Sequence, residues 1–210
     1  MDTLLIEAHF FPSIEYFCAL HPYPTVQLEA HEHYVKQSFR NRCYIRAVHG
    51  VERLTVPLTA KHGKVPVRSV QVDNTNRWSA NLWRTLQSAY ANSPYFEFYR
   101  DDIHRALFSG ERYLFDLNRQ ILSMCLSWLN WSKVVTVSEA YREETPFTDL
   151  RNVISAKHAF GERTIFRPLP YVQVFGSTFV PNLSILDLVC CAGPEAGRII
   201  AGSACGTVNK

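Results

Sequence analysis

Residues 29–45 bring charged, amide and hydroxyl side chains together between two apolar segments. The members that could bind a ligand are three cations and three neutral hydrogen-bonding residues: Lys36, Gln37, Ser38, Arg40, Asn41 and Arg42. Cations bind phosphate or carboxylate, whereas amides and hydroxyls both donate and accept hydrogen bonds and so suit neutral hydroxyl groups. We predict that this segment binds a small anionic substrate such as a nucleotide-sugar. The alternative is a solvent-exposed basic loop, which is the usual role of a run of charges.

His9 is the candidate for proton transfer. The apolar run over residues 3–8 predicts a buried strand, residues 13–20 predict a brief helix, and alternation over residues 26–31 predicts a second strand. If the two strands are parallel, His9 lies beyond the carboxyl end of the first, where open α/β sheets bind their ligands. The imidazole could then act as a general base on an acceptor hydroxyl or amine. The alternative is a loop histidine whose hydrogen bonds serve only the fold.

The rest of the chain alternates between strand and helix patterns. Residues 42–48 and 52–58 predict an antiparallel hairpin, with His49 and Gly50 at the turn. Apolar stripes at helical spacing predict three helices that should supply much of the core, at residues 75–92, 93–110 and 113–130. The remaining expected elements are strands at 67–72 and 134–137, a helix at 147–157, an extended segment at 164–174 and a buried helix at 185–193.

These patterns predict an α/β fold. We expect a single domain over residues 1–201, with a mixed sheet, an early strand-helix-strand unit, an antiparallel hairpin and a cluster of central helices. Residues 202–210 are small and polar, and we expect them to form a disordered tail.

Composition narrows the class of partner. The formal net charge of +3 over 210 residues is too small to indicate nucleic-acid binding, which normally needs a strongly basic face. The N-terminus has no signal-peptide pattern, and no apolar run reaches the roughly 18 residues of a membrane span. The six cysteines show no C-x-x-C spacing, so we expect buried thiols in a reduced, cytoplasmic protein.

No metal or cofactor is identified by the sequence. His31 and His33 would share a strand face with Glu29 beside them, but the set is incomplete, without a clear third and fourth ligand beyond the two histidines, and we expect no bound zinc. Cys190 and Cys191 lie in an apolar helix without a neighbouring base, which indicates core thiols. Neither Walker A, G-x-G-x-x-G nor H-x-G-H is present, so the cofactor is unknown.

Several stretches together resemble the WbqC-like family. They are residues 9–17 (HFFPSIEYF), 34–42 (YVKQSFRNR), 54–57 (LTVP), Trp83 with 88–90 (SAY), 171–175 (YVQVF) and 179–188 (FVPNLSILDL), the last being the most specific. One departure is Glu15, where many relatives have glycine. The family takes its name from a bacterial O-antigen gene cluster, so the resemblance implies a role in making cell-surface polysaccharide.

Two functions remain open. The favoured one is a transferase that modifies a nucleotide-linked sugar or carries an acyl, aminoacyl or glycosyl group to it. In this reaction His9 would be the base and the cations would hold phosphate. The amides of Gln37, Asn41 and Gln173 would orient hydroxyl groups of the substrate. Tyr171 would face the same side as Gln173 and would contact the substrate there. The alternative is a non-catalytic protein that binds such a sugar or a partner enzyme. Both functions require His9 and the segment 36–42 to meet at one cleft.

Overall fold

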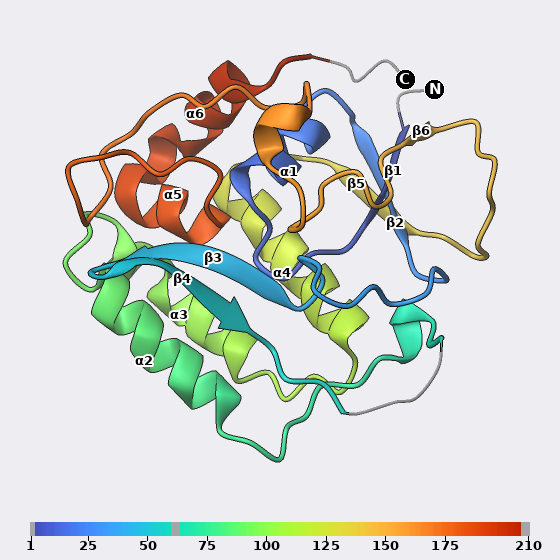
Figure 1. Cartoon of the computed structure of the whole chain (residues 1–210), viewed down its shortest axis with the longest axis horizontal. Coiled ribbons are helices and arrows are strands. Elements are labelled where there is room, and N and C mark those ends of the chain that lie inside the picture. Colours follow the sequence, from blue (N-terminus) through green and yellow to red (C-terminus); the bar gives the residue numbers. More distant parts are fainter. Residues whose placement is uncertain (1–2, 60–63, 207–210) are drawn as a thin grey trace.

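The computed structural model describes residues 3–59 and 64–206. Four parallel strands form its main sheet, in the order β5-β2-β1-β6 (Figure 1). Their bounds are β1 Thr3–Glu7, β2 Thr25–Glu29, β5 Val134–Val137 and β6 Thr148–Asp149. The helix α1, Ile14–Leu20, connects β1 to its parallel neighbour β2, so the expected strand-helix-strand unit is confirmed.

The register of the sheet gathers carboxylates at one edge. Leu4 and Ile6 are fully buried on one face of β1, as expected for a strand between two covered faces. Glu7 ends β1 directly beside Glu29, which ends β2, and Asp149 ends β6 beside Leu5. Because parallel strands end at the same edge, three carboxylates lie at the carboxyl edge of this sheet.

The hairpin is also confirmed, as a separate sheet. It pairs β3, Arg42–Ala47, with antiparallel β4, Gly50–Thr55. Gly50 has a φ of 128°, a conformation that side chains rarely adopt, which explains glycine at this turn. The α/β class is confirmed, with the parallel and antiparallel strands in two sheets rather than mixed in one.

The expected central helices form and bury one face each. They are α2 Trp78–Tyr90, α3 Phe96–Leu107 and α4 Leu114–Trp128. The buried helix expected near the C-terminus is α5, Ile185–Ala192, and a further helix that was not expected, α6, Ala196–Ser203, follows it. Figure 1 shows α5 and α6 beside one another, away from β6.

Two expected elements are wrong. Residues 67–72 do not form a strand. They contain a short 3₁₀ helix, Val67–Ser69, followed by two isolated β-bridges. Gln71 pairs with Tyr113 and Val72 pairs with Leu58, so neighbouring residues have partners in different segments. Residues 147–157 form β6 and turns instead of a helix. The Asp149 carboxylate accepts the backbone N–H of Arg151, and Asn152 has a left-handed φ of 61°, which stops helix growth.

The last third of the chain is largely irregular. Residues 164–174 contain no strand beyond the single bridge of Phe166 to Ala204. Gly202 and Ser203 of the expected tail lie in α6, and the Cys205 N–H donates to the Ile165 carbonyl, whereas residues 207–210 lie outside the described residues. Within the described part of the chain, no helix is long and apolar enough to cross a membrane.

The cysteines of the described chain are all free. Those with buried side chains are Cys18, Cys43, Cys125 and Cys190, whereas Cys205 is exposed. Burial raises the pKa of the Cys191 thiol to about 12, so this group stays protonated and unreactive at neutral pH. The four buried cysteine side chains serve the core.

The N-cap of α5 generates a stability prediction. Ser184 is buried, its Oγ accepts from the Leu186 N–H, and its hydroxyl donates to the Phe11 carbonyl at 2.9 Å. Ser184→Ala should therefore lower the free energy of unfolding by about 1–3 kcal/mol, because it removes a cap and leaves a buried carbonyl unpaired. Urea denaturation measures this change. Ser127→Ala, at an exposed position of α4, is the control and should stay within about 0.5 kcal/mol; an equal effect of both substitutions would contradict the account.

Candidate functional site

The strand order reverses at β1, which marks the candidate site. The chain proceeds from β1 to β2 and β5 on one side and then returns to place β6 on the other side of β1. Open α/β sheets bind ligands beyond the carboxyl ends of their strands at such a reversal. The loops that leave β1 and β6 there carry His9 and Asn152 respectively.

Glu7 and His9 form a buried pair at this edge. His9 Nε2 lies 3.2 Å from Glu7 Oε1, and both side chains are almost completely inaccessible to solvent. The second oxygen, Glu7 Oε2, accepts the Asn152 backbone N–H at 3.0 Å, and Arg40 Nη2 lies 3.8 Å from Oε1. The Glu7 carboxylate is thus contacted by Asn152 in the loop after β6 and by Arg40 in the segment before β3.

The surroundings set the protonation of this pair. Burial lowers the pKa of His9 more than the Glu7 carboxylate raises it, so the imidazole is neutral at physiological pH. Burial alone would raise the pKa of Glu7, but the hydrogen bond from His9 and the charge of Arg40 hold that pKa below its ordinary value. An ionised carboxylate only accepts hydrogen bonds, so Nε2 carries the proton and Nδ1 carries the lone pair. Nδ1 is buried and has no hydrogen-bond partner among the described residues.

Aromatic rings enclose the imidazole. The ring of His9 lies 4.7 Å from that of Tyr16 and 5.4 Å from that of Phe39, measured between centroids. The Tyr16 hydroxyl donates to the Glu7 carbonyl at 2.9 Å, which anchors α1 to the end of β1. These rings hold His9 in one orientation.

Arg40 is an internal cation rather than a surface ligand-binding group. Its Nε and Nη2 donate to Glu32 Oε1 at 2.8 and 2.7 Å, and Nη2 also donates to Asn152 Oδ1 at 2.9 Å. The side chain is 2% exposed. Burial raises the pKa of Glu32 to about 7 despite the charge of Arg40, and Glu32 Oε2 has no hydrogen-bond partner among the described residues.

The remaining residues of segment 36–42 divide into structural and free groups. Ser38 donates to the Val35 carbonyl and accepts the Arg40 N–H, and Asn41 binds the Tyr34 hydroxyl and the Val56 carbonyl. These polar groups already have partners within the fold. Three side chains differ: Lys36 and Gln37 are exposed, and Arg42 is half-buried, with a buried Nε that has no hydrogen-bond partner in the described chain.

The structure brings the loop after β1 and segment 36–42 together. The Phe10 N–H donates to the Phe39 carbonyl at 2.9 Å. Asn118 Nδ2, from α4, donates to the carbonyls of both Ala8 and Arg40, at 3.3 and 2.7 Å. Asn118 was not identified from the sequence, although a lone amide on the buried face of an apolar helix was the available signal.

Tyr171 and Gln173 belong to a different cluster. The Tyr171 and Tyr90 hydroxyls and the Gln173 amide all donate to the Asp187 carboxylate, at 2.6, 2.7 and 2.9 Å. Gln173 also binds the backbone N–H and carbonyl of Val180, both at 2.9 Å. No hydrogen bond joins this cluster to His9 in the described chain, so its role is to shape the loop that precedes α5.

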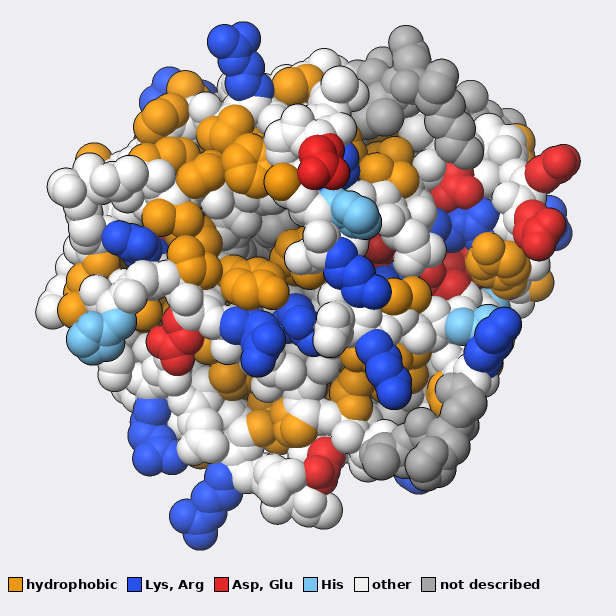
Figure 2. Space-filling view, in the orientation of Figure 1, with side chains coloured by type: hydrophobic (Ala, Val, Ile, Leu, Met, Phe, Trp, Pro, Cys, Tyr) orange, Lys and Arg blue, Asp and Glu red, His pale blue; other side chains and the backbone are white. Residues whose placement is uncertain are grey.

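That loop forms one wall of a hollow of about 220 Å³ near His9. Phe39 lines the hollow, and its ring also packs against that of His9, with 5.4 Å between the centroids. Figure 2 shows that this face of the molecule is hollowed in the view just above the hairpin, with hydrophobic side chains around the rim. Basic side chains are dispersed over the same face rather than gathered in one patch (Figure 2).

An ion pair with a buried carboxylate involves one of the residues that line the hollow. Arg163 lines it and binds the fully buried Glu15 carboxylate through two hydrogen bonds, of 2.6 and 2.7 Å. Asn182, also in the lining, donates to Glu15 Oε2 and accepts the Glu15 N–H. Glu15 thus joins three segments that are distant in the sequence.

Unusual backbone conformations surround the site. Left-handed φ values occur at Phe11 (37°), Gln37 (58°), Asn152 (61°) and Asn182 (56°), which lie in the loops that build it. Such a φ is a genuine outlier for a bulky residue such as Phe11. Strained backbone conformations cluster at active sites and ligand-binding sites, so these φ values support a functional role of this edge of the sheet.

The Glu29 carboxylate is held in a second polar cluster at the same edge. It accepts the Ser138 hydroxyl and the His31 N–H, and Arg151 bridges it to Asp149. β2 ends at Glu29 and His33 is exposed in the following loop, so the expectation that His31 and His33 share a strand face is wrong. Among residues 3–59 and 64–206, no three His, Cys, Asp or Glu side chains are arranged to hold a metal ion.

The buried Glu32 generates a pH prediction. Its pKa rises from 4.5 to about 7 on folding, so the folded state binds more protons between these values and its stability falls as pH rises through them. Glu32→Gln removes this dependence, and the variant should gain stability relative to the wild type between pH 5 and pH 7.5. Urea titrations of both proteins at the two pH values measure the difference. A difference that is the same at both pH values would contradict a raised pKa.

Comparison with known proteins agrees with the motifs. The model of the WbqC-like protein family matches residues 7–169, which include Glu7, His9, Arg40 and Asn152. A protein of Mycobacterium tuberculosis (strain ATCC 25618 / H37Rv), described as the uncharacterized protein Rv1507c, is 28% identical over a 194-residue alignment that covers 78% of this chain and 81% of that protein. No solved structure matches the chain significantly. Because the family match spans well over half of its length, the chain belongs to the WbqC-like protein family.

Proposed function

We propose that this protein is a sugar-modifying transferase of bacterial cell-surface polysaccharide assembly, which moves an acyl, aminoacyl or glycosyl group. The observation that carries the proposal is the unpaired lone pair of His9 Nδ1 at the point where the strand order reverses. Membership of a family named from an O-antigen gene cluster supports the pathway.

In this mechanism His9 is the general base. Its Nδ1 takes the proton of an acceptor hydroxyl or amine while that oxygen or nitrogen bonds to the electrophilic carbon of the donor. The bond from this carbon to the leaving group breaks, and the leaving group keeps the electron pair. Glu7, 3.2 Å from Nε2, stabilises the imidazolium that forms, and the proton then passes to the leaving group.

The free cations of segment 36–42 would hold the anionic part of the donor. Lys36 is exposed and Arg42 has an unpaired Nε, whereas Arg40 is occupied by Glu32. The hollow beside Phe39, of about 220 Å³, is smaller than the roughly 300–1,000 Å³ of typical ligand pockets. It therefore suits a single sugar ring, with the phosphates outside it.

Access to His9 requires movement of Phe39. The imidazole is fully buried, and Phe39, whose ring packs against it, also lines the hollow. In the proposed reaction, substrate binding displaces this ring and exposes Nδ1, which also keeps water from the base before the acceptor arrives.

The second candidate is a non-catalytic protein that binds a nucleotide-sugar or a partner of the same pathway. The burial of His9 and the internal pairing of Ser38, Arg40 and Asn41 favour it, because a binding protein needs no accessible base. The two candidates share the hollow and the cations, and they differ over His9.

The first experiment identifies the ligand. A thermal-shift screen compares nucleotide-sugars, acyl-coenzyme A and aminoacyl donors, because a ligand that binds the folded state raises the melting temperature by mass action. Arg42→Ala should weaken the affinity for the anionic ligand by about tenfold to a hundredfold, the value of a charge-assisted hydrogen bond. Arg198→Ala, which removes an exposed cation of α6, is the control and should bind as the wild type does. Equal affinities in all three proteins would exclude Arg42 from the site.

The second experiment separates the two candidates. His9→Gln keeps an amide that can donate to Glu7 but removes the base at Nδ1. Turnover of the donor and acceptor found in the screen should fall by about a hundredfold to ten-thousandfold, with ligand affinity within a few-fold of the wild type. Full turnover in this variant would show that His9 is not the base. If no donor and acceptor pair gives turnover in the wild type, the binding protein is the better account.

A further inference from the structure

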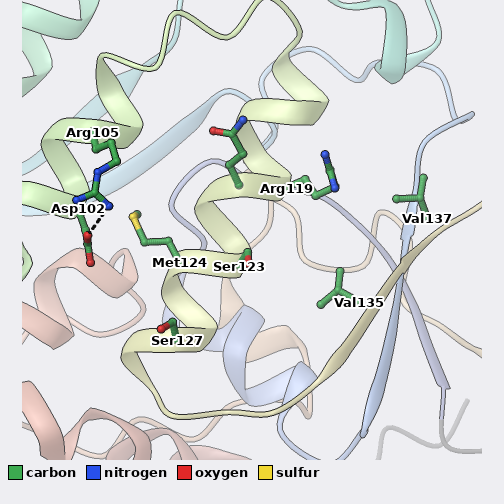
Figure 3. A pocket seen from close by; sticks show the side chains of 9 residues that line it. Asp102, Arg105, Arg119, Ser123, Met124, Ser127, Val135 and Val137 are labelled. Carbon is green, nitrogen blue, oxygen red and sulfur yellow. Dashed lines mark hydrogen bonds and ion pairs between the residues drawn. The ribbon is translucent and has the colours of Figure 1, made fainter.

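A groove outside the candidate site lies along the open edge of the main sheet. Its volume is about 590 Å³. Ser123 and Ser127 come from α4 in the middle, Val135 and Val137 from β5 at one side, and Arg105 from α3 at the other (Figure 3). A second hollow of about 350 Å³ shares residues with the groove, Arg105 among them, and extends it along α3.

The strand that forms one side of the groove has unpaired backbone groups. β5 is the end strand of the sheet and pairs only with β2 in the described chain. The N–H groups of Val134 and Ser138 donate to the Pro24 and Leu28 carbonyls, at 3.0 and 2.9 Å, so the ladder uses every second residue. The backbone groups of residues 135 and 137 therefore point away from β2, and these are the two strand residues that line the groove.

This edge lacks the usual protection against strand addition. Edge strands are commonly guarded by proline, by charged side chains, by a bulge or by a covering element. The β5 sequence, Val-Val-Thr-Val, contains neither proline nor charge, and its pairing to β2 is regular over all four residues. Lys133 precedes the strand, but its Nζ donates to the His21 and Tyr23 carbonyls and so is held against the loop before β2.

The side chains of the groove indicate what it would bind. Arg119 reaches from α4 toward β5 (Figure 3), and its side chain is half exposed. Its Nε lies 3.9 Å from Asp116 Oδ1, which is too far for a strong hydrogen bond. Ser123 and Ser127 offer exposed hydroxyls beside it. In contrast, Arg105 is already paired with Asp102 at 3.0 Å. A half-exposed cation whose own ion pair is long, next to an open strand edge, suits an acidic peptide.

We infer that this groove binds an extended acidic segment of a partner protein, which adds a strand to β5 and places a carboxylate at Arg119. Main-chain hydrogen bonds to Val135 and Val137 supply affinity in this mode of recognition, and side chains that alternate along the peptide supply specificity. Residues of α3 and α4 line the groove together with the two valines of β5.

The test uses a defined probe, the capped heptapeptide Val-Glu-Val-Thr-Val-Glu-Val, titrated into the ¹⁵N-labelled full chain. The amides of Val135 and Val137 should shift and become protected from hydrogen exchange. The same peptide with Lys in place of Glu should bind at least fivefold more weakly, and Arg119→Glu should reverse this preference. Absence of shifts at millimolar peptide, or shifts elsewhere only, would overturn the inference.

Backbone pairing is tested separately. Val135→Pro removes an outward N–H while leaving the ladder to β2 intact, so it should weaken binding about tenfold. Val172→Pro, at an 88% exposed position in an irregular segment, is the control and should bind as the wild type does. A peptide N-methylated at alternate residues provides the same test without changing the protein and should not bind. If sedimentation shows a wild-type dimer that Val135→Pro dissociates, a second copy occupies the edge and the peptide inference is overturned.

Discussion

The buried contact between Glu7 and Arg40 is the interaction on which the rest of the site depends. An ionised carboxylate inside a protein is costly unless it is paired and hydrogen-bonded. Glu7 receives the N–H of Asn152, the imidazole of His9 and the charge of Arg40, so three segments must meet correctly before the end of β1 can be buried. Asn118 then ties the backbone of the His9 loop, at Ala8, to that of the segment around Arg40. The same requirement that stabilises the sheet edge therefore orients His9.

Part of this arrangement could be predicted from the sequence. The apolar runs of β1 and β5 and the stripes of α2, α3 and α4 follow periods that local physics imposes, and all of these elements form. His9 was placed beyond the first strand because parallel strands end at the same edge. The meeting of His9 with the segment around Arg40 followed from the same reasoning.

What the sequence could not predict are pairings between distant residues. The sequence pattern of residues 147–157 is amphipathic and predicts a helix. In the structure, Thr148 and Asp149 pair with β1, and the turn at Asp149 follows, and these interactions outweigh the local helical preference. Arg40, Ser38 and Asn41 resembled ligand-binding groups because their types suit anions and hydroxyls, and only the structure shows that internal partners occupy them. Glu32 carries no local signal of its role, and the lone amide of Asn118 on an apolar helix face does not reveal its partners, since these lie on other elements.

The central claim is that His9 is a neutral imidazole with its proton on Nε2 and a bare lone pair on Nδ1. Long-range ¹H–¹⁵N NMR of the ring nitrogens in the wild-type protein measures this directly. At neutral pH the account predicts one protonated nitrogen, assigned to Nε2, and one unprotonated imine nitrogen, assigned to Nδ1, with titration below the ordinary histidine range because burial lowers the pKa. A protonated Nδ1, in the other tautomer or in an imidazolium at neutral pH, would contradict it.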